Sequence, residues 1–322
     1  MKGRSVGIVG GGPIGLFCAL ALTAKAGLKG DRVAIFDRGD PSRTAGMSAS
    51  AFVDFDWSHP SKPVIDRQKR SLAVYRSLAG TPGTAVSYGP IYVFRRGPRD
   101  LESGERHLDA SERPTGFDHG TAAETFRINP PVFLKWMREE LARRGVLFVV
   151  REVKDFAEVK SECGATVIVN ASGVGARELC GDLQVVPYRG HCAVVRLPNA
   201  PQQVRLVAGE QTWYVASGPD ECRIGGTSDE DCWDLNPDPK AVEAIFRRVK
   251  TIMPPGFDPE PNLITVTCGL RPRRHGGLRL EVENTGHFEV VHCYGHGGDG
   301  FRDGPGCGME VRNLVLPRVA LD

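Results

Sequence analysis

The sequence predicts an α/β protein with two lobes. A glycine turn at residues 10–15 separates a short apolar run from an apolar helical pattern, which indicates a βαβ unit at the start of the chain. Between residues 184 and 226, several apolar runs follow one another without a helix, which is typical of an antiparallel sheet. The length of 322 residues suits two lobes better than one minimal domain.

The βαβ unit is predicted from the order of its parts. The apolar run Ser5–Val9 is the first strand, and the helical pattern covers Ile14–Ala26. A second buried strand follows at Val33–Phe36. The next segment, Gly39–Ser50, is rich in small and hydroxylated residues, which favours a loop that lies against a ligand, although an ordinary surface loop has the same composition.

Apolar periodicity and turn residues predict the remaining elements. Residues 99–123 are polar and rich in charged residues, so we expect a surface excursion without chemistry. The predicted helices cover Ser61–Leu78, Pro130–Arg144, Lys240–Ile252 and a stretch around Cys307–Leu314, and the predicted strands include Tyr88–Phe94, Leu147–Val150, Thr166–Val169 and Phe288–Val291.

Composition excludes several classes of function. The formal charge of +2, from 41 basic and 39 acidic residues, gives no global attraction to nucleic acid or to a membrane surface. No apolar stretch reaches the roughly 18 residues of a spanning helix. The nine cysteines form no C-x-x-C pair, so we expect reduced thiols and no metal site.

The first glycine turn fits the pattern G-x-G-x-x-G, in which backbone N–H groups and the helix N-terminus hold a pyrophosphate. Asp37 follows the second strand about 20 residues downstream, where an acidic group accepts hydrogen bonds from ribose hydroxyls. A tight turn that binds nothing explains the glycines but does not require Asp37. The residues expected to contact the dinucleotide here are Gly10, Gly12, Pro13, Ile14 and Gly15.

A second glycine loop, His292–Gly300, distinguishes a flavin from a nicotinamide cofactor, which the first turn cannot do. It follows a predicted strand and precedes a predicted helix. Glycine allows backbone N–H groups to approach a flat ring closely, and a helix N-terminus beside that ring stabilises an anionic reduced flavin. The alternative is a glycine-rich turn that only precedes the last helix.

These motifs resemble a known family. Gly269–Arg273 together with Val291–Gly298 is similar to the paired C-terminal signatures of the D-amino acid and D-aspartate oxidases, and Val167–Val174 and Pro187–Gly190 resemble two further family segments. The resemblance spans most of the chain and is weakest between residues 95 and 125. It implies FAD as the cofactor and a Rossmann-like FAD-binding domain over residues 1–84, 130–183 and 268–322, with a substrate domain over 85–129 and 184–267.

The resemblance also implies roles for individual residues. Arg271 would clamp the substrate carboxylate through two charge-assisted hydrogen bonds, Tyr214 would add another, and Gly298 would lie beside the reacting atoms. Asp37 and Arg38 would contact the adenosine. The remaining residues implied to bind FAD are Thr44, Ser48, Ala49, Ser50, Ser172, Gly173, Gly297, Gly298 and Gly300, with Arg271.

The implied reaction is oxidative deamination. A hydride passes from the substrate α-carbon to the flavin, the imino acid hydrolyses to a keto acid and ammonia, and dioxygen reoxidises the flavin with release of hydrogen peroxide. A neutral amine is sufficient for this step, so no general base is assigned. His292 and His296 are interpreted as structural, and Cys293 as a buried free thiol rather than a covalent attachment point for the flavin.

Several positions depart from the family and bear on the substrate. Ala51 and Val53 replace larger or polar side chains, and Ser228 stands where D-aspartate oxidases carry a second arginine. Val204–Gln211 is shorter than the family's active-site lid. Asp299 would favour a cationic side chain unless it is a solvated loop residue. The sequence therefore predicts a D-amino acid with a neutral, bulky or basic side chain.

Other functions stay open on the sequence alone. They are a glycine, sarcosine or other secondary-amine oxidase, an amine oxidase of specialised metabolism, an NAD-dependent dehydrogenase and a catalytically silent flavin-binding protein. The expected partners are an amino acid or amine and dioxygen, without nucleic acid or membrane, and a homodimer is left open. A cytoplasmic location is expected, because the C-terminus lacks the S-K-L type peroxisomal signal.

Overall fold

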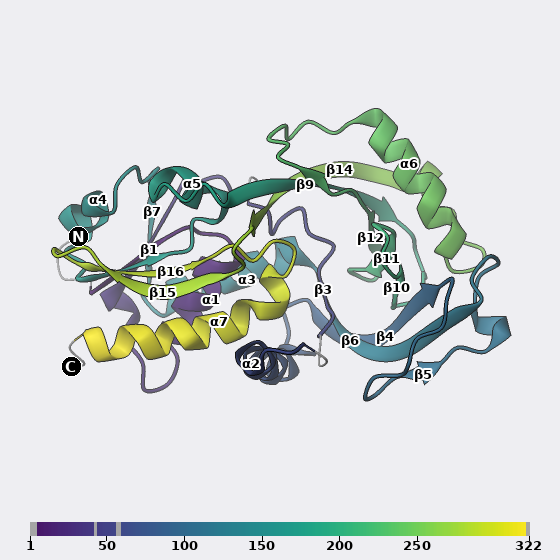
Figure 1. Ribbon diagram of the computed structural model, residues 1–322, viewed down its shortest axis with the longest axis horizontal. Coiled ribbons are helices and arrows are strands. Elements are labelled where there is room, and N and C mark those ends of the chain that lie inside the picture. The colour runs from purple at the N-terminus through teal and green to yellow at the C-terminus, as the bar shows by residue number, and fades with distance from the viewer. Residues whose placement is uncertain (1–4, 42–43, 56–58, 320–322) are drawn as a thin grey trace.

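The computed structural model describes residues 5–41, 44–55 and 59–319. Its first layer is a six-stranded sheet of order β15-β16-β8-β1-β2-β7, in which only β15 runs antiparallel to its neighbour (Figure 1). Its strands are β1 (Val6–Val9), β2 (Val33–Asp37), β7 (Leu147–Val150), β8 (Val167–Asn170), β15 (Arg279–Asn284) and β16 (Glu289–Tyr294).

Helices cover both faces of this sheet because its strands alternate apolar side chains between the two faces. Val6 and Ile8 of β1 join the core beneath α1, α3 and α7, whereas Val9 joins the core beneath α4. The helices of this lobe are α1 (Pro13–Leu22), α2 (Lys62–Leu78), α3 (Pro130–Arg143), α4 (Phe156–Cys163), α5 (Ala176–Leu179) and α7 (Gly300–Val315).

The second layer is a larger, mostly antiparallel sheet of order β13-β9-β12-β11-β10-β4-β6-β3, to which β14 adds along β9 and β5 along β6. Helix α6 (Pro239–Val249) lies over one face of it (Figure 1). The strands are β3 (Phe52–Val53), β4 (Val86–Arg95), β5 (Arg106–His107), β6 (His119–Ile128), β9 (Val185–Arg196), β10 (Val204–Val207), β11 (Trp213–Ala216), β12 (Glu221–Gly225), β13 (Asp229–Glu230) and β14 (Leu263–Arg274).

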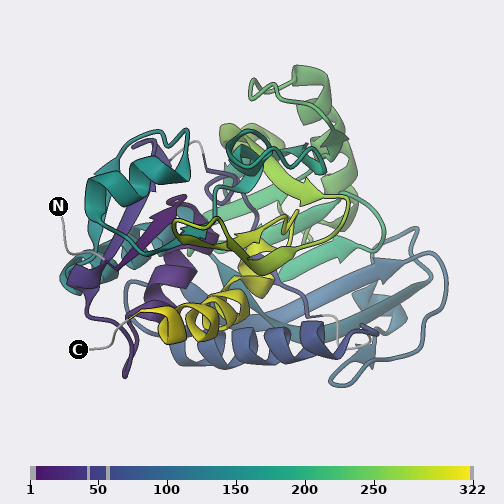
Figure 2. The same ribbon diagram turned by 60° about the vertical axis from the view of Figure 1, so that its left-hand side comes forward.

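The two-lobed α/β fold predicted from the sequence is confirmed, and the two lobes lie side by side in both ribbon views (Figures 1 and 2). Long strands connect them, because β9 and β14 run out of the second sheet toward the first (Figure 1). The predicted domain boundary at residue 268 lies inside β14, which pairs with β9 over nearly its whole length. The division into two domains stays a prediction.

Several elements differ from the sequence prediction, which lacks the short helices α4 and α5. The last helix begins at Gly300, seven positions before the predicted stretch, and β6 extends back to His119 within the predicted excursion. Strand β10 pairs in parallel with β4, so the second sheet is not purely antiparallel. The C-terminal tripeptide considered as a targeting signal lies outside the described residues.

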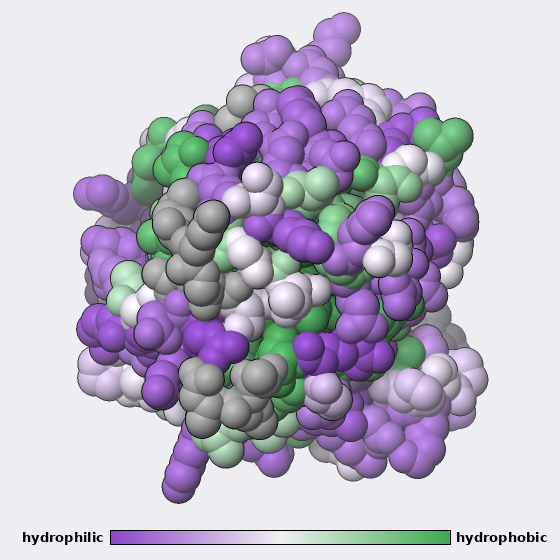
Figure 3. All heavy atoms as spheres, turned by 90° about the vertical axis from the view of Figure 1, so that its left-hand side faces the viewer, coloured by the Kyte–Doolittle hydropathy of each residue, from purple (hydrophilic) through white to green (hydrophobic). Residues whose placement is uncertain are grey.

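The surface of the first lobe is mainly hydrophilic in the view of Figure 3, where apolar residues form small, separate groups. Within the described ranges, no helix is both long enough and apolar enough to cross a membrane.

Candidate active site

A cavity of about 1510 Å³ lies between the two sheets. It exceeds the roughly 300–1,000 Å³ typical of small-molecule pockets, so it has room for a dinucleotide together with a small substrate. All but two of the predicted site residues line it. They are Gly10, Gly12, Pro13, Ile14, Asp37, Arg38, Thr44, Ser48, Ala49, Ser50, Ser172, Gly173, Arg271, Gly297, Gly298 and Gly300.

The first glycine turn connects β1 to α1 with almost no space for side chains. Gly10 has a φ of +117°, and a Cβ there would lie 2.3 Å from the carbonyl oxygen of Ala171. A Cβ on Gly15 would lie 1.9 Å from the carbonyl oxygen of Gly10, so Gly15 shapes the turn from behind rather than lining the cavity. Gly12 is the N-cap of α1 and would meet only Thr44, at 3.9 Å. The turn thus leaves the N-terminus of α1 open toward the cavity.

Asp37 stands at the end of β2, beside this turn. Its Oδ1 accepts a hydrogen bond from the Gly39 N–H (2.7 Å), and its Oδ2 pairs with Arg138 of α3. A carboxylate offers about four lone-pair sites, so Asp37 keeps the capacity to accept bonds from sugar hydroxyls. The sequence reasoning missed Arg138, and no local pattern marks it, because its partner is far away along the chain.

The loop that contains Ser48, Ala49 and Ser50 is attached to the second sheet at several points. The Ser48 hydroxyl donates to the Cys268 carbonyl (2.9 Å), and the Ser50 hydroxyl contacts the Cys192 sulfur (3.0 Å). A Cβ on Gly269 would lie 2.9 Å from Ser48 Cβ, so β14 needs a glycine where this loop crosses it. The loop therefore belongs to the wall between the two lobes.

A chain of hydrogen bonds fixes the turn at Ser172 and Gly173. Asn170 Oδ1 accepts from the Ser172 N–H (3.2 Å) and hydroxyl (2.6 Å), and its amide nitrogen lies 3.3 Å from His292 Nδ1. Because that amide nitrogen only donates, His292 Nδ1 accepts, and its Nε2–H donates to Glu283 at 3.0 Å. His292 is 1% exposed and has no contact with the cavity, which agrees with the structural role predicted for it.

These hydrogen bonds of His292 predict that the folded protein loses stability in acid. Burial lowers the pKa of His292, so as pH falls below about 6.5 the unfolded chain binds a proton that the folded chain resists. Between about pH 7 and about pH 5, the free energy of unfolding should fall by at most about 1.4 kcal/mol per pH unit from this group. Urea unfolding at several pH values measures it. A His292→Gln variant should show a shallower decline, and equal slopes in the two proteins would refute the assignment.

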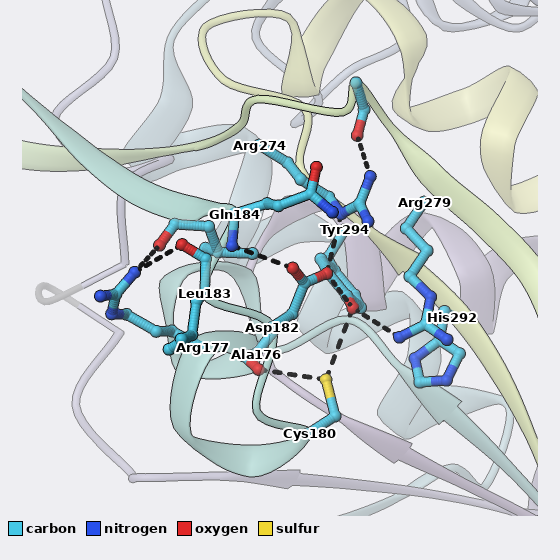
Figure 4. A network of polar contacts seen from close by, with 12 residues as sticks. Ala176, Arg177, Cys180, Asp182, Leu183, Gln184, Arg274, Arg279, His292 and Tyr294 are labelled. Carbon is cyan, nitrogen blue, oxygen red and sulfur yellow. Dashed lines mark hydrogen bonds and ion pairs between the residues drawn. The ribbon is translucent and has the colours of Figure 1, made fainter.

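A second polar network anchors the strand that carries Arg271 (Figure 4). Asp182 accepts from Arg274 Nε (2.7 Å) at the end of β14 and from the Tyr294 hydroxyl (2.8 Å) at the end of β16. Arg279 donates to the same tyrosine oxygen (2.9 Å). Burial opposes ionisation of Asp182, but Arg274 and Tyr294 lower its pKa. The network holds the end of β14 against the glycine loop Gly295–Gly298.

Arg271 brings a half-buried positive charge to the cavity. Its Nη1 donates to the Thr227 carbonyl (2.8 Å), and no ion pair within the described ranges involves it. The acidic residue that most affects its pKa, Asp229, is paired with Arg189 at 3.0 Å. Burial lowers the pKa of Arg271, but arginine starts high enough to stay protonated at neutral pH. The guanidinium is thus available to a carboxylate in the cavity.

Gly190 on β9 makes room for that guanidinium. A Cβ at this position would lie 2.3–2.4 Å from three atoms of the Arg271 head group. We expect Gly190→Ala to displace the head group and to lower kcat/KM at least tenfold, while FAD binding stays near normal. Steady-state kinetics and the bound flavin content measure the two effects. Unchanged kcat/KM in a flavin-loaded variant would contradict this role.

The structure does not place Tyr214 in the cavity. Tyr214 is 0% exposed, packs in the core beneath α6, and donates its hydroxyl to the Pro201 carbonyl at 3.0 Å. Successive residues of a strand face opposite sides of the sheet, so its neighbour Trp213 lines the cavity instead. The expectation that Tyr214 donates a hydrogen bond to the substrate is therefore wrong. Trp213, and not Tyr214, lies in the cavity wall.

The rest of the wall contains several positions discussed for substrate choice. Ser228, Ala51 and Asp299 line the cavity, whereas Val53 is buried in the core. The Asp299 side chain is 51% exposed and pairs with Arg302 at 3.0 Å. Partial desolvation of the carboxyl group raises the pKa of Asp299, and the positive charge of Arg302 opposes this rise. Asp299 is thus a carboxylate that faces the cavity but already has a cationic partner.

A cluster of buried sulfur and imidazole groups joins the second glycine loop to α7. One ligand atom each from Cys293, His296 and Cys307 lies within 4.8 Å of the others. The pKa values of both thiols are raised well above the ordinary value, that of Cys293 chiefly by its contact with Cys18 and that of Cys307 by burial. Protonated thiols are poor metal ligands. The expectation of no metal stays a prediction.

Comparisons with known proteins point to one family. The family model described as DAO, FAD dependent oxidoreductase, matches residues 5–314. Proteins named D-amino-acid oxidase from Rubrobacter xylanophilus and Streptomyces coelicolor are each 34% identical to this chain, the first over 98% of both chains and the second over 96% of this chain and 95% of its own. The human protein named D-aspartate oxidase is 26% identical over 98% of this chain and 95% of its own.

Solved structures share the fold. Glycine oxidase from Geobacillus kaustophilus superposes with a TM-score of 0.83 at 20% identity, over 100% of this chain and 96% of its own. L-proline dehydrogenase from P. horikoshii superposes with a TM-score of 0.78 at 13% identity, over 99% of this chain and 95% of its own. At these identities the likeness concerns the fold alone.

Proposed function

This chain belongs to the DAO family of FAD-dependent oxidoreductases, and we propose that it deaminates D-amino acids oxidatively. The observation that carries the proposal is Arg271, a half-buried guanidinium that faces the cavity without an ion-pair partner among the described residues. The full-length similarity to two D-amino-acid oxidases supports the same reaction. Dioxygen is the proposed acceptor, and hydrogen peroxide is the proposed product.

The residues present fit FAD. Two glycine segments border the cavity without side chains, and a Cβ at Gly10, Gly15 or Gly295 would collide with backbone or side-chain atoms within 2.8 Å. We propose that the N-terminus of α1 holds the pyrophosphate and that Asp37 accepts bonds from the ribose. Gly297 and Gly298, which precede α7, would lie against the flavin ring. Bound FAD supplies the hydride acceptor.

The residues around Arg271 orient the substrate. Arg271 can hold the carboxylate through two parallel bonds, which fixes the α-carbon relative to the ring. Trp213 contributes an apolar wall, and Gly298 leaves the backbone near Arg271 uncovered, since a Cβ there would lie 3.8 Å from Arg271 Cδ. The site needs no dedicated base, because a substrate with a neutral amine can release its hydride directly.

The proposed substrate has a neutral, bulky or basic side chain. Ser228 in the wall offers no charge for an acidic side chain, and the cavity is large. The alternative is a glycine or secondary-amine oxidase, because the glycine oxidase from Geobacillus kaustophilus has a similar fold. The proposed division into an FAD domain and a substrate domain follows the two sheets. A homodimer stays a prediction.

Product analysis tests the proposal. The purified protein should release hydrogen peroxide and the matching keto acid from neutral or basic D-amino acids, with kcat/KM at least tenfold higher than for D-aspartate, glycine or sarcosine. Higher efficiency with glycine or sarcosine would select the alternative. Peroxide formation from D-aspartate at an equal or higher kcat/KM would refute the assigned substrate class.

A further inference from the structure

Arg223 of β12 holds the loop that forms part of the cavity wall. It is 3% exposed, and its Nη1 donates to the carbonyl oxygens of Met47 and Ala49, each at 3.1 Å. The loop belongs to the first lobe by sequence, whereas Arg223 belongs to the second sheet. Two peptide groups of the loop are thus oriented by one side chain from the other lobe.

The orientation of those carbonyls fixes the direction of two N–H groups. In a trans peptide the N–H points opposite to the C=O, so the N–H groups of Ser48 and Ser50 point away from Arg223. Ser48 and Ser50 line the cavity, whereas Arg223 does not, so Arg223 lies on the far side of the loop. Neither N–H donates to another group in the described part of the chain. Two unused donors therefore face the cavity.

The charge of Arg223 is only partly compensated. Glu221 lies 3.6 Å from its Nε and also accepts bonds from Asn129 (3.2 Å) and Ser217 (3.1 Å). The Glu221 side chain is 36% exposed, so water screens its charge, whereas that of Arg223 is 4% exposed. The buried cation stands directly behind the two peptide groups, where it polarises them and strengthens their N–H groups as donors.

We propose that Arg223 is a positioning residue for the flavin. It directs the N–H groups of Ser48 and Ser50 toward the cofactor and adds positive potential behind them. Fixed donors bind a negatively charged group more strongly than a neutral one, so this arrangement favours the reduced, anionic flavin over the oxidised form. The inference rests on the proposed function only in requiring that FAD occupies the cavity.

A redox measurement separates positioning from simple support of the fold. Arg223→Met removes the charge and both hydrogen bonds to the loop carbonyls at similar volume. For this variant we expect at least a tenfold larger loss of affinity for reduced than for oxidised FAD, which lowers the midpoint potential by about 30 mV for a two-electron couple. Arg223→Lys keeps the charge and should give a smaller shift. The readouts are the dissociation constant of oxidised FAD and the midpoint potential of the bound flavin.

Arg144→Met is the matched control. Arg144 also donates to a backbone carbonyl, that of Leu20 (3.3 Å), but lies outside the cavity wall, so its loss should leave the potential unchanged. If Arg223→Met weakens oxidised and reduced FAD equally, Arg223 supports the fold only and the inference is wrong. If Arg223→Met fails to fold, an unshifted potential in Arg223→Lys contradicts it in the same way. Wild-type protein that binds no FAD would instead refute the proposed function.

Discussion

Arg271→Ala is expected to abolish turnover of amino acids while leaving the flavin bound. Two charge-assisted hydrogen bonds contribute about 1.5–3 kcal/mol each, so their loss should lower kcat/KM by about 10²–10⁴-fold. Among the residues that the structure describes, this arginine donates one hydrogen bond to the protein, to the Thr227 carbonyl, so the fold should tolerate its removal. Steady-state kinetics and the visible spectrum of the purified variant measure both parts of the prediction.

A charge-conserving variant tests the geometry of this contact. Arg271→Lys keeps a cation but loses the planar pair of donors, so we expect kcat/KM between those of Arg271→Ala and the wild type. Benzoate, a carboxylate without an α-hydrogen, should perturb the flavin spectrum of the wild type and not that of Arg271→Ala. Equal benzoate affinity in the two proteins would show that another group binds the carboxylate.

Gly15→Ala should weaken FAD binding severely. The new Cβ would lie 1.9 Å from the carbonyl oxygen of Gly10, so the turn between β1 and α1 must move and the N-terminus of α1 loses its alignment. We expect at least a hundredfold weaker FAD binding, measured by fluorescence titration of the apoprotein, together with a lower Tm.

Two other glycines serve as controls. Gly12→Ala meets only Thr44 at 3.9 Å, so the apoprotein should keep its Tm, yet the methyl group stands where a pyrophosphate would approach. It should therefore weaken FAD binding without a loss of stability. Gly97→Ala, which meets no atom within 4 Å, should change neither quantity. Normal FAD affinity in Gly12→Ala would place the cofactor elsewhere.

The nucleotide half of the site could be predicted from the sequence because its signals are local. The glycine turn, the strand before it and Asp37 lie within about one βαβ unit, where spacing alone sets the geometry. The first residue of the last helix was harder to predict from the sequence. Glycines favour a loop, so α7 was predicted to begin late, but Gly304 and Gly308 are needed because a Cβ would lie 2.5 Å from the Phe17 ring or 2.6 Å from its carbonyl oxygen.

The substrate half depends on contacts that no local pattern contains. The family resemblance implied that Tyr214 contacts the substrate, whereas the pairing of β11 with β12 and the packing of α6 turn Tyr214 into the core and place Trp213 in the cavity wall. A shift of one residue in a strand exchanges its two faces. Gly190 and Arg223 were missed for a related reason, since each acts on a residue brought near only by the fold.

Anaerobic mixing of the purified, flavin-loaded protein with the two enantiomers of one neutral amino acid tests the central claim most directly. We predict that D-methionine bleaches the flavin band at roughly 450 nm, a general property of flavins, in the wild type, that L-methionine leaves this band intact, and that Arg271→Ala responds to neither. Bleaching by the L-enantiomer, or by D-methionine in Arg271→Ala as fast as in the wild type, would contradict it.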